Sequence, residues 1–433
     1  MRVEQGYDPA DPLFREGNLS RWVNSPYCAP ALPIIYYFAS RLRDSIKALT
    51  PRPELFTLSP EALTDSLLAR LDAKLSRQIH RAVILEINGD RIMGLLQGET
   101  PEARFRDFTK QMQSAERRAR FFADYPVLFD TLHAALSDWR EANEEFLIRL
   151  RADFAELQST FGATGAFAKF ADGSGDSHNR GRSVMVLEFA SGKRIVYKPH
   201  NIDVDAQFQN FLHWMSQQGL PTERLLFLAK EKYGWVEFVT NSPCANEAEV
   251  ETFYERAGQL LAALYLLGGT DVHSENLIAR GAQPIVIDVE TLFHPHVIDN
   301  TLPNPSDDAR SLLTKEIGNS VLKTDFLPRL KGAPERAADQ SGLGGRAGQA
   351  TAIKGRGVVS MGTDEIRIAE TTYTTGQVRN RPRLEGKEIR VNGDALVRGF
   401  EHGYRVFLEN RSVLLELLEG FRHLTIRAVP RNS

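Results

Sequence analysis

The amino-acid sequence predicts an α+β protein, in which a helical N-terminal part precedes a region of short strands and helices. Apolar residues recur at helical spacing through the first 160 residues. From residue 161, short apolar runs alternate with turns that contain glycine, which is the pattern of hairpin strands. A polar turn followed by a short buried strand then lies between Gly268 and Phe293. We therefore expect three parts, residues 1–160, 161–245 and 246–433.

The composition is that of a globular protein with more than one domain. The chain has 433 residues, of which 42% are hydrophobic and 25% are charged. Its net charge of −3 gives no argument for nucleic acid or an acidic membrane as a partner. Two cysteines, Cys28 and Cys244, do not make a disulfide framework and suit a reducing compartment. Because no signal peptide and no apolar run of about 20 residues is present, we expect a cytoplasmic protein without a membrane span.

The first 160 residues are expected to be helical and to supply core packing. Ser59 followed by Pro60 is typical of a helix N-terminus, with the serine as the N-cap. Apolar stripes at helical spacing follow, at Leu63–Leu71, Leu128–Trp139 and Phe146–Leu157. We assign no chemistry to this part, which forms either a cap or a docking surface for a partner.

A β-hairpin is expected next, with strands at Ser183–Phe189 and Arg194–Pro199 around a turn that contains Gly192. The preceding loop, residues 175–182, is rich in glycine and ends in Gly181 and Arg182. Glycine lets backbone amides approach an anion closely, and an arginine adds a charge-assisted contact. The alternative is an ordinary glycine-rich turn.

The polar turn carries the residues with the clearest chemistry. Asp271, His273 and Asn276 fall within six residues, and Asp288 and Glu290 follow the apolar run Pro284–Ile287. Phosphoryl transfer needs one Asp to accept the proton of the attacking hydroxyl, and an Asn and a second Asp to hold Mg²⁺. The spacing of Asp271 and Asn276 is that of protein kinases, and the string D-x-H-x-x-N resembles the catalytic loop of lipid kinases. The alternative is a polar turn before a strand, with Asp288 as a cap.

Two upstream residues fit this interpretation. Lys198, at the end of a predicted strand, would meet the α- and β-phosphates of ATP. Glu237 lies in the predicted strand Trp235–Val239, which is either an adenine-side hinge or another core strand. No Glu occurs between Pro199 and Pro221 to pair with the lysine, so Asp203, Asp205 or a more distant acid must take that place.

The C-terminal part contains two segments of distinctive composition and a helical end. Residues 331–357 are rich in glycine, alanine and charge, and we expect a mobile surface segment that resembles an activation loop. Five basic residues between Arg379 and Arg390 form either a solvated face or a docking strip for phosphate or peptide. Residues 394–418 are expected to be helical.

Taken together, these strings resemble the dehydratase region of the class II (LanM-type) lanthipeptide synthetases over nearly all of the chain. The similar strings are TPEARFRDF at 100–108, YPVLFDTL at 125–132, GDSHNRGRSV at 175–184, VYKP at 196–199, GWVEFV at 234–239, TDVHSENLIA at 270–279, IDVETLF at 287–293 and NSVLKTDFLP at 319–328. So many matches in order are more specific than the kinase-like turn alone.

The resemblance implies a two-lobed, lipid-kinase-like catalytic domain with a helical N-terminal embellishment. It also implies that Ser and Thr of a precursor peptide with a leader are phosphorylated from ATP and Mg²⁺, and that the phosphate is then eliminated. Asp271 would be the base, with His273 beside it. Asn276 and Asp288 would hold Mg²⁺ with Glu290 close by, and Lys198 would bind phosphate.

For the elimination step, the resemblance implies an Arg and a Thr in an R-x-x-x-R-x-T string. Arg427 matches the first Arg, and Ser433, the last residue given, stands where Thr is expected. A cation near the leaving phosphate would stabilise its developing charge.

Members of this family usually continue into a zinc-bearing cyclase, and Cys28 and Cys244 lie far from any Cys/His cluster in the sequence. We therefore expect no zinc in this chain and a separate cyclase as a partner, with the chain as a shortened product, half of a split enzyme or a fragment. The leading hypothesis is an ATP-dependent peptide dehydratase. The alternatives are a peptide or small-molecule kinase that stops before elimination, and a non-catalytic scaffold that binds the leader peptide.

Overall fold

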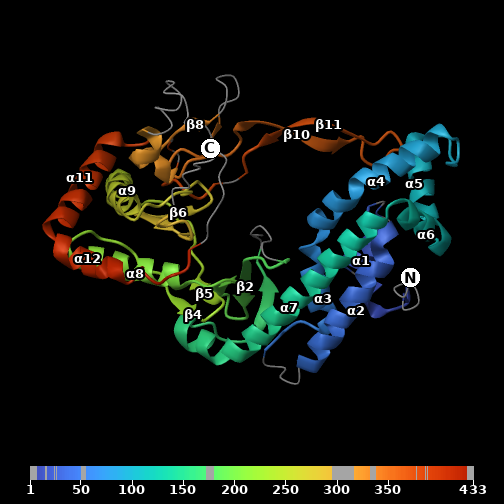
Figure 1. The fold of residues 1–433 in the computed structure, drawn as a ribbon, viewed down its shortest axis with the longest axis horizontal. Helices are drawn as coiled ribbons and strands as arrows, with labels where there is room; N and C mark the ends of the chain where they lie inside the picture. The colour runs from blue at the N-terminus through green and yellow to red at the C-terminus, as the bar shows by residue number, and fades with distance from the viewer. Residues whose placement is uncertain are drawn as a thin grey trace, which may run out of the picture. The chain divides into compact units, whose positions relative to one another are not determined.

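The structure of the protein is a computed structural model of helices and antiparallel strands, as the predicted α+β class requires (Figure 1). It describes residues 7–14, 17–23, 25, 27–49, 55–171, 180–294, 316–331, 338–376, 378–385, 387 and 389–426. The chain forms two compact units. The first contains Met1–His200, Lys232–Glu237 and Arg356–Glu370, and the second contains Asn201–Glu231, Phe238–Gly355 and Thr371–Ser433. The predicted domain boundaries at residues 160 and 245 stay predictions.

Helices make up most of the first unit, as the apolar periodicity predicts. The side chain of Ser59 accepts a hydrogen bond from the amide of Ala62, so the predicted N-cap with Pro60 at the first helical position is confirmed. The helix at Pro126–Phe161 is capped at its C-terminus by Gly162, whose φ of 65° is left-handed. The helices are α1 (Asn18–Trp22), α2 (Leu32–Leu49), α3 (Pro60–Ala69), α4 (Asp72–Ile92), α5 (Pro101–Gln111), α6 (Ala115–Asp124) and α7 (Pro126–Phe161), with short 3₁₀ turns at Pro12–Phe14 and Ala29–Ala31.

Four strands of the first unit form an antiparallel sheet in the order β1-β2-β3-β5. They are β1 (Phe167–Phe170), β2 (Met185–Phe189), β3 (Arg194–Lys198) and β5 (Gly234–Glu237). The predicted hairpin is therefore present as β2 and β3, in which Met185 pairs with Tyr197.

Buried polar groups on α7 attach this helix to the sheet. Asp153 accepts hydrogen bonds from the hydroxyl of Tyr233 and the indole of Trp235, both at 2.8 Å. Arg149 donates to the hydroxyl of Tyr197 at 2.7 Å. Burial raises the pKa of Tyr197 and of Tyr233, and for Tyr233 the hydrogen bond to Asp153 adds to the effect, so both phenols stay protonated.

The second unit packs its helices around a core that supports a small hairpin. Trp214 of α8 (Asp203–Gln217) stacks on Phe407 of α11 (Gly393–Glu409) with ring centroids 6.0 Å apart. The helical region predicted at residues 394–418 is present as two helices that meet at Asn410. The elements are α8 (Asp203–Gln217), β4 (Phe227–Ala229), α9 (Glu247–Leu266), β6 (Leu277–Arg280), β7 (Gln283–Val286), a 3₁₀ turn at Val321–Thr324, β8 (Leu330–Lys331), β9 (Ala338–Asp339), α11 (Gly393–Glu409) and α12 (Arg411–Glu419).

The strands β10 (Ala350–Val359) and β11 (Arg367–Thr374) pair with each other, and each contains residues of both units. Among the described residues, no helix combines the length and apolar character that a transmembrane segment needs.

Helices α9 and α11 lie alongside each other because two glycines let their backbones approach closely (Figure 1). A Cβ atom added at Gly399 would lie 1.8 Å from the carbonyl oxygen of Glu255, and one added at Gly258 would lie 2.0 Å from that of Leu396. Both obstacles are backbone atoms, so no side-chain movement can relieve either clash.

We therefore expect Gly399→Ala to lower the free energy of unfolding by about 3 kcal/mol or more, because a methyl group there overpacks a backbone contact. Urea denaturation measures the loss. The matched control is Gly393→Ala on the same helix, where an added Cβ has no atom within 4 Å. That variant should be unchanged or more stable by up to about 1 kcal/mol. Equal stability of the two variants would contradict the close packing.

Candidate functional site

The β6–β7 hairpin sets the geometry of the candidate site in the second unit. Leu277 pairs with Val286 at the open end of the hairpin, and the amide of Ile287 donates to the carbonyl of Asn276 at 3.0 Å. This extra pair extends the ladder by one residue in each strand. The backbones of Asn276 and Asp288, distant in sequence, therefore lie at the same end of the hairpin.

The turn before β6 closes on itself and brings together three of the predicted residues. The side-chain amide of Asn276 donates to the carbonyl of Asp271 at 2.9 Å. The Nε2 atom of His273 lies 3.9 Å from Oδ1 of Asp271, and its Nδ1 atom is 3.3 Å from the amide of Glu275. The side chains of Asp271 and His273 keep about 30% of their surface exposed, so the carboxylate can be reached from solvent.

Asp271 has a backbone conformation that is costly for a residue with a side chain. Its φ angle is +66°, in the left-handed region that glycine prefers and that Asn and Asp tolerate better than most residues. Hydrogen bonds hold the chain on both sides of it. Thr291 donates its hydroxyl to the carbonyl of Thr270, and the amide of Val272 donates to the carbonyl of Thr324 at 2.9 Å. Residues with a strained backbone conformation are common at functional sites.

The residues predicted to hold a metal offer suitable oxygen atoms. The amide nitrogen of Asn276 is used by Asp271, which leaves the amide oxygen as the acceptor of that side chain. Oδ1 of Asp288 accepts the amide of Glu290 at 3.1 Å, which fixes the side chain next to the hairpin end. Carboxylate and amide oxygens suit Mg²⁺, which usually takes one or two protein carboxylates together with water and substrate phosphates. The chemistry of the donor set therefore fits this ion.

In the described part of the chain, no group of three or more His, Cys, Asp or Glu side chains lies close enough to hold a metal ion. Burial raises the pKa of the Cys28 thiol to about 12 and also raises that of Cys244. A thiol with a raised pKa is a poor nucleophile and a poor metal ligand near neutral pH.

The expectation of a surface segment at residues 331–357 is wrong for Ser341–Gly345, which is buried. The amide of Ser274 donates to the carbonyl of Gln340 at 2.9 Å, and His273 pairs with Ser341 as an antiparallel bridge. This segment therefore lies against the turn that carries Asp271. Its composition suggested exposure because glycines are common in loops, but here they permit close backbone contact.

The remaining predicted residues with described positions belong to the first unit. Lys198 is the last residue of β3 and is only 6% exposed, and it pairs with Gly234. Glu237 ends β5 opposite Ile195. Gly181 has a φ angle of 76°, which suits the glycine predicted there.

Arg182 has a partner that the sequence analysis missed. Its guanidinium donates to Oε2 of Glu145 on α7, with the Nε contact at 2.8 Å, and Glu145 also pairs with Arg149 one turn later. The spacing of Glu145 and Arg149 in the sequence was the only available signal, since residues four apart share one helix face. The predicted role of Arg182 with phosphate stays a prediction.

Several predicted residues lie outside the described residues. They are Arg427 and Ser433 of the elimination string and residues 175–179 of the glycine-rich loop. Their roles stay predictions.

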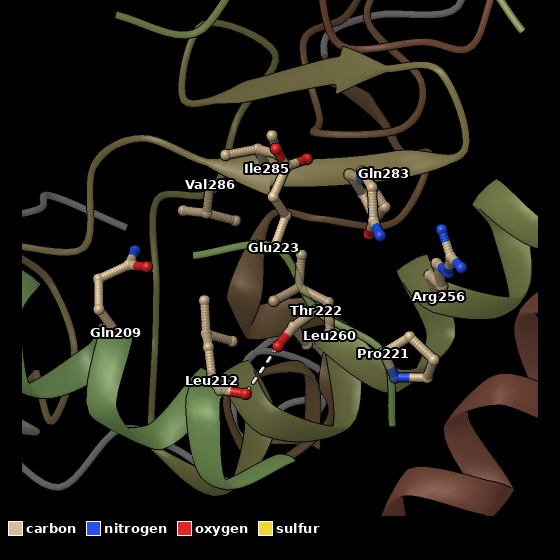
Figure 2. A pocket seen from close by; sticks show the side chains of 11 residues that line it. Gln209, Leu212, Pro221, Thr222, Glu223, Arg256, Leu260, Gln283, Ile285 and Val286 are labelled. Atoms are coloured by element: carbon tan, nitrogen blue, oxygen red, sulfur yellow. Dashed lines mark hydrogen bonds between the residues drawn. The ribbon is translucent and has the colours of Figure 1, made fainter. Parts of the chain in front are cut away.

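A small pocket of about 20 Å³ lies between α8, α9 and β7 (Figure 2). Thr222, on its wall, donates its hydroxyl to the carbonyl of Leu212 at 2.6 Å. The lining includes none of Asp271, His273, Asn276 or Asp288. Because this volume holds about one water molecule, the pocket is not a substrate site.

Comparison with known proteins places the chain in a family. Residues 125–433 match the family described as "Domain of unknown function (DUF4135)", so the chain belongs to that family. The chain is also similar to the lacticin 481/lactococcin biosynthesis protein LcnDR2 of Lactococcus lactis subsp. lactis, with 27% identity over 382 residues. This similarity covers 82% of the chain and 40% of that relative. The predicted resemblance to the LanM-type lanthipeptide synthetases is thereby confirmed.

The strained backbone at Asp271 leads to a stability prediction that is independent of any activity. Asp271→Gly should leave the free energy of unfolding within about 1 kcal/mol of wild type, because relief of the left-handed strain offsets the entropy that glycine loses on folding. Asp271→Val should lower it by about 1–2 kcal/mol, because a branched side chain fits this conformation poorly. Thermal unfolding followed by circular dichroism ranks the three proteins. A glycine variant less stable than the valine variant would show that the carboxylate serves the fold instead.

Proposed function

We propose that this chain takes part in lanthipeptide maturation as the dehydratase of a precursor peptide. In this proposal it transfers phosphate from ATP to Ser and Thr hydroxyls and then eliminates that phosphate. The observation that carries the proposal is the end of the β6–β7 hairpin, where Asn276 and Asp288 lie at the same end and the side chain of Asn276 contacts the strained Asp271. The similarity to LcnDR2, described as a biosynthesis protein of lacticin 481/lactococcin, supports the same reading.

In the phosphorylation step, the carboxylate of Asp271 accepts the proton of the Ser or Thr hydroxyl as its oxygen attacks the γ-phosphorus. The bond between that phosphorus and ADP breaks, and ADP leaves with the electron pair. The oxygens of Asn276 and Asp288 would hold Mg²⁺, with Glu290 close by, and the ion would neutralise phosphate charge when bound. His273 lies beside the base, and the amide of Glu275 orients its ring.

In the elimination step, a base removes the Cα proton of the phosphorylated residue, and the bond between Cβ and oxygen breaks. Phosphate leaves with the electron pair of that bond, and a Cα–Cβ double bond remains as dehydroalanine or dehydrobutyrine. A cation next to the leaving phosphate lowers the barrier because negative charge grows there. The proposal gives this role to Arg427, with Ser433 in the place of a threonine.

The proposal gives the first unit the role of binding nucleotide. Lys198 would contact phosphate, with Gly181 and Arg182 as further phosphate contacts and Glu237 as the adenine-side residue. It also includes the lipid-kinase-like arrangement of two lobes, a cytoplasmic location and a separate cyclase as a partner. The chain spans 40% of the relative that it matches, so activities of that whole relative are carried over only as proposals.

A kinase without elimination and a leader-binding scaffold remain the competing functions. The strained Asp271 favours an enzyme over a scaffold, because strained backbone conformations are common at active sites. Mass spectrometry of a precursor peptide incubated with the protein and Mg-ATP separates all three. Loss of water indicates a dehydratase, a stable phosphate adduct indicates a kinase, and an unchanged but bound peptide indicates a scaffold.

Asp271→Asn should lower the rate of peptide phosphorylation by about 100-fold or more, because the amide cannot accept the hydroxyl proton. Asparagine also tolerates the left-handed backbone, so the fold should persist. Quenched time courses read by mass spectrometry measure the rate. The control is Asp130→Asn on an exposed position of α7, which should phosphorylate at the wild-type rate. An Asp271→Asn protein with wild-type activity would remove this residue from the mechanism.

Arg427→Ala should let phosphorylated peptide accumulate, because elimination loses its cation while phosphorylation keeps its base. The ratio of phosphorylated to dehydrated peptide over time reports the change. Fully dehydrated product at the wild-type rate would refute the assignment of Arg427 to elimination. Loss of both steps would instead point to a role in binding the peptide.

A further inference from the structure

The segment Ser341–Gly345, here called the glycine clamp, has a contact with residues 271–276, here called the catalytic turn, that the proposed mechanism does not use. An added Cβ at Gly342 would lie 2.7 Å from the carbonyl oxygen of Val272, and one at Gly345 would lie 2.4 Å from Cβ of Ser274. Real Cβ atoms do not approach other atoms this closely, so only glycine fits at both positions. The clamp therefore contacts Val272, which follows Asp271, and Ser274, which follows His273.

Polar contacts add to this close fit. The Ser274 amide donates to the carbonyl of Gln340 at 2.9 Å. On the other side of the clamp, the amides of Gly342 and Leu343 donate to the carbonyls of Asp325 and Phe326 at 2.9 and 2.8 Å. The clamp is thus packed between the catalytic turn and the chain that follows the Val321–Thr324 turn. The Val321–Thr324 turn also contacts the catalytic turn, because the carbonyl of Thr324 accepts a hydrogen bond from the amide of Val272.

Two buried polar side chains from outside the clamp, those of Asn380 and Asp339, form hydrogen bonds with it. Asn380 is fully buried and donates its side-chain amide to the carbonyls of Gly342 at 2.6 Å and Gly345 at 3.2 Å. Asp339 accepts both the amide and the hydroxyl of Ser341, at 2.9 and 2.6 Å. Asn380 thus links the carbonyls of two residues in the clamp, and Asp339 holds the first residue of the clamp.

We infer that the glycine clamp positions Asp271, with Gly345 and Asn380 as positioning residues that act through the turn Val272–Ser274. This inference rests on the proposed role of Asp271 as the base. Left-handed backbone at Asp271 persists only where the surrounding structure holds it. The clamp supplies that restraint from a segment about 70 residues further along the chain. A base displaced by 1 Å can lose about 100-fold in rate.

A double-mutant cycle between Gly345 and Ser274 tests the contact. Gly345→Ala places a methyl group against the Ser274 side chain, and Ser274→Gly removes that side chain, so the next obstacle is the carbonyl of Ser341 at 3.2 Å. The first readout is amide hydrogen exchange of a peptide covering residues 271–276. Gly345→Ala should speed this exchange by about tenfold or more, and the double variant should restore it to within about threefold of wild type.

Exchange in α9, which precedes the turn, is the internal control and should stay at the wild-type rate if the unit remains folded. Gly376→Ala is the matched control variant, because an added Cβ there has no atom within 4 Å. If Gly345→Ala prevents folding, Asn380→Ala replaces it, since this change removes two hydrogen bonds without adding bulk. Unaltered exchange at residues 271–276 in a folded variant overturns the inference.

The second readout is peptide phosphorylation. Gly345→Ala should lower kcat by about 10- to 100-fold and change KM for ATP by less than about threefold, with kcat recovered in the double variant. A folded Gly345→Ala protein with wild-type kcat overturns the positioning role. If wild-type protein phosphorylates no precursor peptide, the proposed function fails. The exchange result then still decides whether the clamp holds the turn.

Discussion

The backbone pairing of β6 with β7 is the constraint on which the candidate site depends. Its register, with Leu277 opposite Val286, continues through the bond from the Ile287 amide to the Asn276 carbonyl. Because side chains alternate along a strand, a slip of one residue would turn Asp288 to the other face of the hairpin. This register places Asn276 opposite Ile287, so Asn276 and Asp288 lie diagonally at the same end of the hairpin. Ile285 and Val286 are both buried, so both faces of β7 contribute to the core there.

Around this hairpin, the site is held by segments that are far apart in the sequence. Thr324 and Gln340 accept amides of the catalytic turn, and Asn380 fixes the glycine clamp that lies on it. Each bond contributes about 1 kcal/mol, which is comparable to the cost of the left-handed backbone at Asp271. The strain is thus offset by contacts with segments outside the turn. Variation in those distant segments can therefore alter the position of Asp271.

The sequence could predict what depends on local spacing and could not predict what depends on tertiary contact. The N-cap at Ser59, the β2–β3 hairpin and the turn containing Asp271 and Asn276 follow from signals within a few residues, and the structure contains each of them. The burial of Ser341–Gly345 was missed because glycine and charge are typical of exposed loops. The close contacts of Gly342 with the Val272 backbone and of Gly345 with Ser274 explain two of those glycines, and no local pattern reveals these contacts.

Glu145 shows how such a missed contact bears on a predicted role. Its ion pair with Arg182 leaves about a quarter of each side chain exposed. A pair of this kind contributes at most about 1 kcal/mol, because water screens it. A phosphate group carries more charge than a carboxylate and accepts more hydrogen bonds, so it can compete for the same guanidinium. Glu145 therefore orients Arg182 in the free protein without preventing it from binding an anion, and the pairing and the predicted phosphate contact are compatible.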